Sequence, residues 1–95
     1  MTTEKASAIA RRKILEEIEH EAEMECYFHA KVNRTPIELC HEDLKIELHY
    51  TKSLLEKTEL AKRMGIPDEE IENARGAGIE KAWEAVEEAD CIGWE

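Results

Sequence analysis

The chain has 95 residues, of which 42% are hydrophobic, 38% are charged and five are aromatic. Glycine and proline together number only six, which argues against a turn-rich β-sandwich and favours helices. With 13 basic and 23 acidic residues, the formal net charge of -10 argues against direct binding to a nucleic-acid backbone, which needs clustered basic side chains.

Features missing from the sequence indicate the cellular compartment of the protein and the redox state of its cysteines. No apolar run approaches the roughly 20 residues of a membrane span, and the first residues lack the apolar core of a signal peptide. We therefore expect a cytoplasmic protein without a membrane partner. Three cysteines are too few, and odd in number, for a disulfide framework, so free thiols are expected.

The first predicted helix covers residues 3–32. Small or apolar side chains and one histidine recur along it at spacings of three and four residues, which places them on one helical face. They are Ile14, Leu15, Ile18, Ala22, Cys26 and His29. The segment Asn33-Arg34-Thr35-Pro36 then separates this helix from the next, because asparagine tolerates a left-handed stop and proline starts a new helix well.

The second predicted helix covers residues 36–64. Thr35 is expected to cap it, with Pro36 in the first position and Glu38 completing a capping box. Gly65 is expected to end it in the left-handed conformation. Its apolar stripe, expected to face the core, is Ile37, Cys40/His41, Leu44, Leu48, Thr51, Leu55, Thr58 and Ala61.

The third predicted helix covers residues 67–90, with acidic residues in its first turn, where they suit the helix dipole. Gly76-Ala77-Gly78 is a weak point, since each glycine costs about 1 kcal/mol relative to alanine. The sequence leaves open whether the helix is continuous, kinked or broken there. Trp83 is expected in the core. Small residues form one face of this helix: Ala74, Gly78, Ala82, Ala85 and Ala89.

These elements predict an all-α, three-helix bundle-like domain over residues 1–95. The first two helices should form an antiparallel hairpin in which Ile18 faces Tyr50, with the third helix at its open end. Some large side chains of the hairpin fall off the main stripes, and a two-fold homodimer would cover them. They are Tyr27, Phe28, Leu39, Ile46, Tyr50 and Leu60.

The segment from Leu60 to Ala74 resembles a helix-turn-helix motif. Ala61, Gly65 and Ile71 have the spacing of the small residue, turn glycine and aliphatic anchor of that motif. The helix that would read DNA is acidic, however, and would repel phosphate. An ordinary corner between two helices is the interpretation we adopt.

Negative charge is concentrated in the last third of the chain. Residues 66–95 carry ten acids and two bases, so they account for eight of the ten net negative charges. Such a face can imitate a phosphate ladder and occupy a basic groove, or it can simply keep the protein soluble. The candidate partner-binding residues are Asp68, Glu69, Glu72, Glu80, Glu84, Glu87, Glu88 and Trp94, the last as an interface anchor.

All four histidines and two of the cysteines fall between residues 20 and 49. In an antiparallel hairpin some of them come near one another, which makes a zinc site conceivable. Histidines along a helix–helix contact are the commoner arrangement, so no metal is assigned. The candidate ligands are His20, Cys26, His29, Cys40 and His49.

These observations favour a small acidic protein-binding module that is not an enzyme and needs no cofactor. The most concrete version is a phage-type inhibitor that acts on a host defence or nucleic-acid enzyme through an acidic, DNA-mimicking face. Its protein partner would have a basic surface. Two alternatives remain open: a metal-binding helical hairpin that uses side chains between residues 17 and 49, and an accessory subunit of a cellular complex.

Overall fold

The computed structural model describes residues 3–94, with side chains from residue 7 onward. Its elements, in chain order, are α1 (Thr3–Arg34), the 3-10 helix η1 (Ile37–Leu39), α2 (His41–Arg63) and α3 (Asp68–Ile92). The described part contains no strand, which confirms an all-α fold with three α-helices. None of these helices combines the length and the apolar character that a membrane crossing requires.

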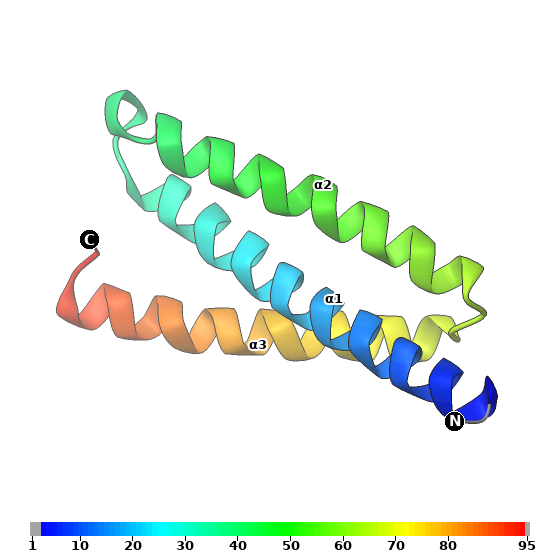
Figure 1. The fold of residues 1–95 in the computed structure, drawn as a ribbon. Helices are drawn as coiled ribbons and strands as arrows, with labels where there is room; N and C mark the ends of the chain where they lie inside the picture. The colour runs from blue at the N-terminus through cyan, green and yellow to red at the C-terminus, as the bar shows by residue number, and fades with distance from the viewer. Residues whose placement is uncertain (1–2, 95) are drawn as a thin grey trace.

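Helix α1 is the central element of the fold. Both α2 and α3 pack along it, whereas they hardly contact each other (Figure 1). The third helix therefore does not sit at the open end of a hairpin, as predicted, but runs along α1 on a different face from α2. Because the turn at residues 64–67 joins α2 to α3, the two helices converge at that end and diverge toward the other.

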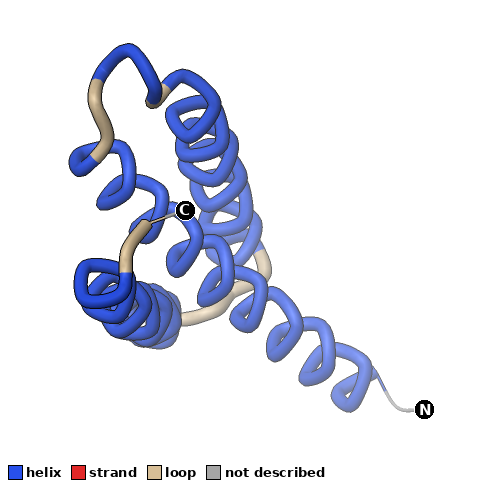
Figure 2. Tube along the Cα trace, turned by 90° about the vertical axis from the view of Figure 1, so that its left-hand side faces the viewer, coloured by secondary structure: helices blue, strands red, loops and turns tan. Residues whose placement is uncertain are grey.

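The molecule is elongated, with principal extents of 52 × 23 × 22 Å. The first described turns of α1 extend beyond the other two helices, and every described side chain from Ser7 to Lys13 is exposed (Figure 2). The main hydrophobic core lies where α2 and α3 converge on α1. It consists of Ile14, Ile18, Ala22, Leu54, Ala61, Ile66 and Ile71.

The turn between α2 and α3 confirms the predicted role of Gly65. Its φ is 82°, a conformation that side chains other than glycine rarely adopt. The amide of Ile66 donates to the carbonyl of Ala61, and the amide of Gly65 donates to that of Lys62. These two bonds form a Schellman motif, which satisfies carbonyls at the end of α2.

The connection between α1 and α2 differs from the prediction. Thr35 does not cap a following helix, because its hydroxyl donates to the carbonyl of Lys31 at 2.7 Å. The chain then makes the η1 turn, and α2 begins only at His41, with no side-chain cap. The predicted capping box from Thr35 to Glu38 is therefore wrong, and the connection is longer than expected.

The longer connection shifts the register of the hairpin. The register predicted from Ile18 opposite Tyr50 would also place Glu21 opposite Glu47. Glu47 instead accepts a hydrogen bond from His29, and Glu21 meets Lys57. Phe28 stacks on Tyr50, with ring centroids 6.1 Å apart. These partners of α1 thus lie about two to three helical turns further along α2 than the short-turn geometry predicted.

Helix α2 turns a largely polar face toward α1. Ion pairs join the two helices, Lys31 to Asp43 at 3.2 Å and Lys57 to Glu21 at 2.7 Å. The apolar stripe predicted to enter the core lies mostly outside it, with Leu48 59% exposed and Leu55 60% exposed. Within that stripe only Cys40 and Ala61 are buried, so the prediction is wrong for most of its positions.

Helix α3 continues without interruption through Gly76 and Gly78. A Cβ atom at Gly78 would collide with the carbonyl oxygen of Glu19 and lie 2.9 Å from the amide nitrogen of Glu23. The absence of a side chain at this position therefore allows α3 to approach the backbone of α1 closely. The small-residue face packs as expected, with Gly78, Ala82 and Ala89 buried.

Candidate interaction surfaces

The outer side of α3 carries an exposed group of carboxylates. Ile71, Gly78 and Val86 are buried on its inner side, and this fixes which side chains point outward. All seven acidic candidates from the sequence are exposed. We call the four in the second half of the helix the acidic surface: Glu80, Glu84, Glu87 and Glu88.

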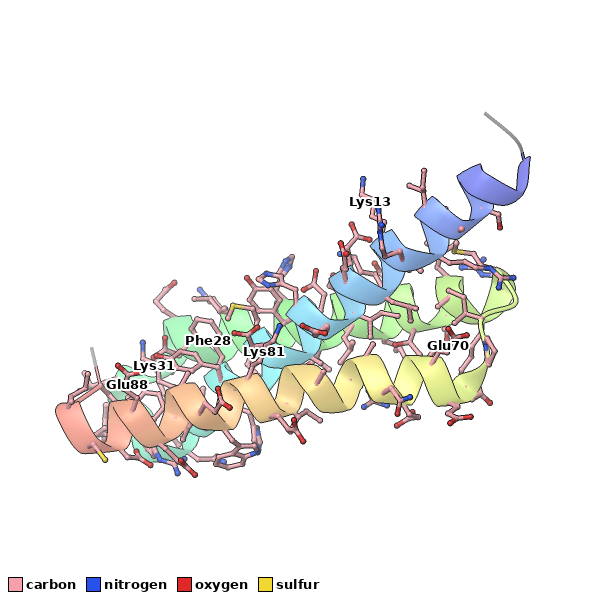
Figure 3. All side chains as sticks on the ribbon, turned by 90° about the horizontal axis from the view of Figure 1, so that it is seen from below. Lys13, Phe28, Lys31, Glu70, Lys81 and Glu88 are labelled. Carbon is pink, nitrogen blue, oxygen red and sulfur yellow. The ribbon has the colours of Figure 1, made fainter. Side chains whose placement is uncertain are left out.

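No member of the acidic surface has an ion-pair partner within the described residues. Of the other three candidates, Glu72 pairs with Arg75 at 3.3 Å, while Asp68 and Glu69 lie exposed in the first turn. The other base of α3, Lys81, is labelled in Figure 3 where α3 passes α1. Its amine is bonded to the carboxylate of Glu19 on α1. That bond is the main cause of the raised pKa of Lys81, but the nearby charge of Glu84 also helps to raise it, so this base offsets part of the negative charge of the acidic surface.

The structure places the two tryptophans differently, Trp83 exposed on α3 and Trp94 partly buried against α1. Trp83 was expected in the core, but it is 46% exposed, so that prediction is wrong. Trp94 folds back onto the end of α1, where its ring lies 5.4 Å from that of Tyr27, and Arg34 lies over it at 5.8 Å. A shallow depression of about 600 Å³ is lined by Tyr27 and Trp94 and also by Glu88 and Ile92.

Asp90 holds the Trp94 cluster together. The indole N–H of Trp94 donates to its carboxylate at 2.7 Å, and Arg34 donates to the same oxygen at 2.9 Å. These two bonds lower the pKa of Asp90 from its usual 3.8, with the bond from Trp94 as the larger cause. Sequence patterns gave no sign of this role, because the three residues come from two distant segments.

The stability that Asp90 contributes is present above pH 3.8 and is lost as the pH falls through its lowered pKa. Changing Asp90 to Asn should release the indole. In a Trp83→Phe background, we expect greater acrylamide quenching of Trp94 fluorescence at neutral pH in D90N. The parent should reach the same quenching only at a pH below 3.8. Equal quenching of the two proteins at neutral pH would contradict this role.

The candidate metal ligands are spread over the hairpin. Cys40 is buried and its thiol donates to the carbonyl of Ile37, whereas His20 and His49 pack against Tyr50. Cys26 and His29 lie together at a cavity. Within the described residues, no three histidine, cysteine or carboxylate side chains lie close enough together to hold a metal ion.

A groove runs between α2 and α3, with α1 as its floor. Two cavities of about 320 and 220 Å³ lie along it and share Glu25 of α1. Glu47 and Ile79 line the wider one, together with Cys26 and His29. Burial raises the pKa of the Cys26 thiol, with a smaller contribution from Glu25, which favours the neutral thiol over the nucleophilic thiolate.

Sequence reasoning did not find this groove. It exists because α2 and α3 both pack on α1 and leave a space between them. The sequence feature that could have indicated it is the apolar stripe of α2, which was predicted to face the core but borders the groove instead. No protein family model, curated protein or solved structure matches the chain.

Proposed function

We propose that this chain is a small non-catalytic protein-binding module, and that the acidic surface of α3 binds a basic surface of another protein. The observation that carries the proposal is a set of four neighbouring carboxylates, all exposed and without a cationic partner among the described residues. The close contact of α3 with α1 presents them on a rigid helix. Such a field attracts a basic partner and accelerates association.

The concrete form we propose is a phage-type inhibitor that occupies the basic groove of a host defence or nucleic-acid enzyme. Carboxylates along one helix would then take the place of phosphates. A partner that uses its basic surface for another purpose would instead make the chain an accessory subunit of a cellular complex. Competition by duplex DNA distinguishes these two forms, because only the first partner binds DNA through the same surface.

The test is capture of proteins from a bacterial lysate on the immobilised chain. Changing Glu84, Glu87 and Glu88 together to Gln should reduce the captured amount about tenfold at low salt, because attraction between exposed charges is lost. Glutamine is a good helix former, so the fold should persist. The matched control changes Glu38, Glu42 and Glu56 to Gln, three exposed acids outside α3.

The control variant should capture as much as the parent, and captured proteins should elute with salt. Elution by duplex DNA would support the inhibitor, whereas elution by salt alone would support the accessory subunit. Equal capture by the parent and both variants, or no capture by the parent, would refute the binding role of the acidic surface.

We also propose that the chain forms a two-fold homodimer. The residues first expected to drive it are partly covered, since Tyr27, Phe28 and Tyr50 pack against one another or against Trp94. Other large apolar side chains support the proposal, among them Leu48, Leu55 and Trp83, each exposed by more than 45% of its surface. Apolar groups gathered on a monomer surface favour an interface.

A further inference from the structure

Helix α2 carries two stripes with the alternating three- and four-residue spacing of a coiled coil. The inner stripe, which faces α1, contains Cys40, Asp43, Glu47, Tyr50, Leu54, Lys57 and Ala61. We call the other one the outer stripe: Leu44, Leu48, Thr51, Leu55 and Thr58. A helix with two such stripes has surfaces for two neighbouring helices, and α1 occupies only one of them.

The outer stripe borders the groove between α2 and α3. Thr51, Leu55 and Thr58 line its narrower cavity, together with Arg75 of α3. Across the groove, Ile79 lines the wider cavity, and Trp83 follows it by four residues on the same side of α3. The groove therefore has apolar side chains on both walls, in the setting where another helix would pack.

The pattern of the outer stripe is complementary to itself. In an antiparallel pair of α2 helices, Leu44 lies opposite Leu55 of the second copy, and Leu48 lies opposite its Thr51. The same register repeats on the other side of the two-fold axis, so each leucine has an apolar or small neighbour. A two-fold axis requires this kind of self-complementarity.

Charges beside the outer stripe favour the antiparallel direction. Lys45 and Lys52 flank its first half, and Glu59 flanks its second half, all of them exposed. Lys45 contacts Glu42 of its own helix only at 3.8 Å and in solvent, a pair that contributes little. Antiparallel packing brings Lys45 near Glu59 of the second copy, and only Lys52 meets its own copy. Parallel packing would instead leave Lys45 and Glu59 of the two copies far apart, because they lie 14 residues apart along α2.

We infer that the occupant of this groove is α2 of a second copy, packed antiparallel along the outer stripe. The inference rests on the proposed homodimer and adds the surface, the direction and the register. It leaves the acidic surface of α3 free, so the dimer can bind a basic partner on each side.

Sedimentation equilibrium at about 100 µM protein tests whether the outer stripe forms the dimer interface. The parent should be a dimer, and changing both Leu48 and Leu55 to Arg should raise the dimer dissociation constant about 100-fold, because a charge would enter an apolar contact. The fold should survive, since both positions are exposed in the single copy. The matched control is Leu60→Arg, an exposed leucine of α2 outside the outer stripe, which should remain dimeric.

Exchanging the charges at positions 45 and 59 tests whether the two α2 helices pack antiparallel. Lys45→Glu alone and Glu59→Lys alone should each weaken the dimer about tenfold, and the double variant should restore it. Circular dichroism verifies that each variant remains helical. A monomeric parent would refute the homodimer itself. A dimer that survives L48R/L55R, or a double charge variant no stronger than the single ones, would refute this surface or direction while leaving the homodimer intact.

Discussion

Alanine in place of Gly78 should lower the free energy of unfolding by about 1–3 kcal/mol, the range of a small-to-large change in a packed interior. The added Cβ would meet the backbone of α1 at Glu19 and Glu23, which cannot move aside as a flexible side chain would. Alanine is the better helix former, but that gain of about 1 kcal/mol does not offset the collision. Denaturant unfolding followed by circular dichroism measures the change.

Gly76 supplies the matched control two residues away. It lies on the same helix, and a Cβ there would have no heavy atom within 4 Å. Gly76→Ala should therefore raise the free energy of unfolding by about 0.5–1 kcal/mol, because alanine has less backbone entropy to lose. Similar effects of both substitutions, in either direction, would show that α3 does not rest on α1 at Gly78.

Removing Lys57 is the second change that should lower the free energy of unfolding substantially. Its amine donates to Glu21 at 2.7 Å, and Glu21 is only 8% exposed, with its second carboxylate oxygen already without a partner among the described residues. Lys57→Met would leave a mostly buried carboxylate with no cation. We expect a loss of about 2 kcal/mol at neutral pH, measured by denaturant unfolding.

The pH dependence of that loss identifies its cause. The hydrogen bond to Glu21 raises the pKa of Lys57 above its usual 10.5, although burial opposes this. A raised pKa in the folded state means that the stabilisation is complete below pH 10.5 and declines as the pH rises through the higher value. The difference between parent and K57M should therefore be constant from pH 7 to about pH 9 and shrink above 10.5.

Two further variants test whether the pair acts as a unit. Replacing both Glu21 and Lys57 with Met should cost less than K57M alone, because no unpaired charge stays buried. Lys13→Met, at an exposed position of α1, should change stability by less than about 0.5 kcal/mol. A double variant less stable than K57M would contradict the assignment of Glu21 as the group left unpaired.

Local signals predicted the helices well, because they depend on neighbours in sequence. Periodicity identified three helices, and the left-handed turn at Gly65 marked the end of the second within a residue or two. The predicted start of α2 was five residues too early. The hydroxyl of Thr35 can either cap a following helix or donate to a carbonyl of the preceding one, and the sequence does not distinguish these two arrangements. Because Thr35 bonds to the preceding helix, the connection between α1 and α2 is longer than predicted, and the register of the whole hairpin is shifted.

Which face of each helix is buried was harder to predict than where each helix begins and ends. Periodicity finds an apolar stripe, but it does not reveal whether that stripe faces the core or a second interface. In α2 the more apolar stripe points outward, and the inner contact depends on ion pairs such as Lys31–Asp43. For the same reason the sequence placed Trp83 in the core. The exposed carboxylates of α3 were easier to find, because a helix with many more acids than bases cannot bury or pair most of them.

The close approach of α3 to α1 should decide how the molecule opens in concentrated salt. Ion pairs join α1 to both neighbours, Lys31–Asp43 to α2 and Arg34–Asp90 to α3, so dissolved salt weakens some of the attraction on each side. Close contact between small side chains does not respond to salt, and α3 makes such contact through Gly78, Ala82 and Ala89. Partial openings should therefore begin with the departure of α2 while α1 and α3 stay paired.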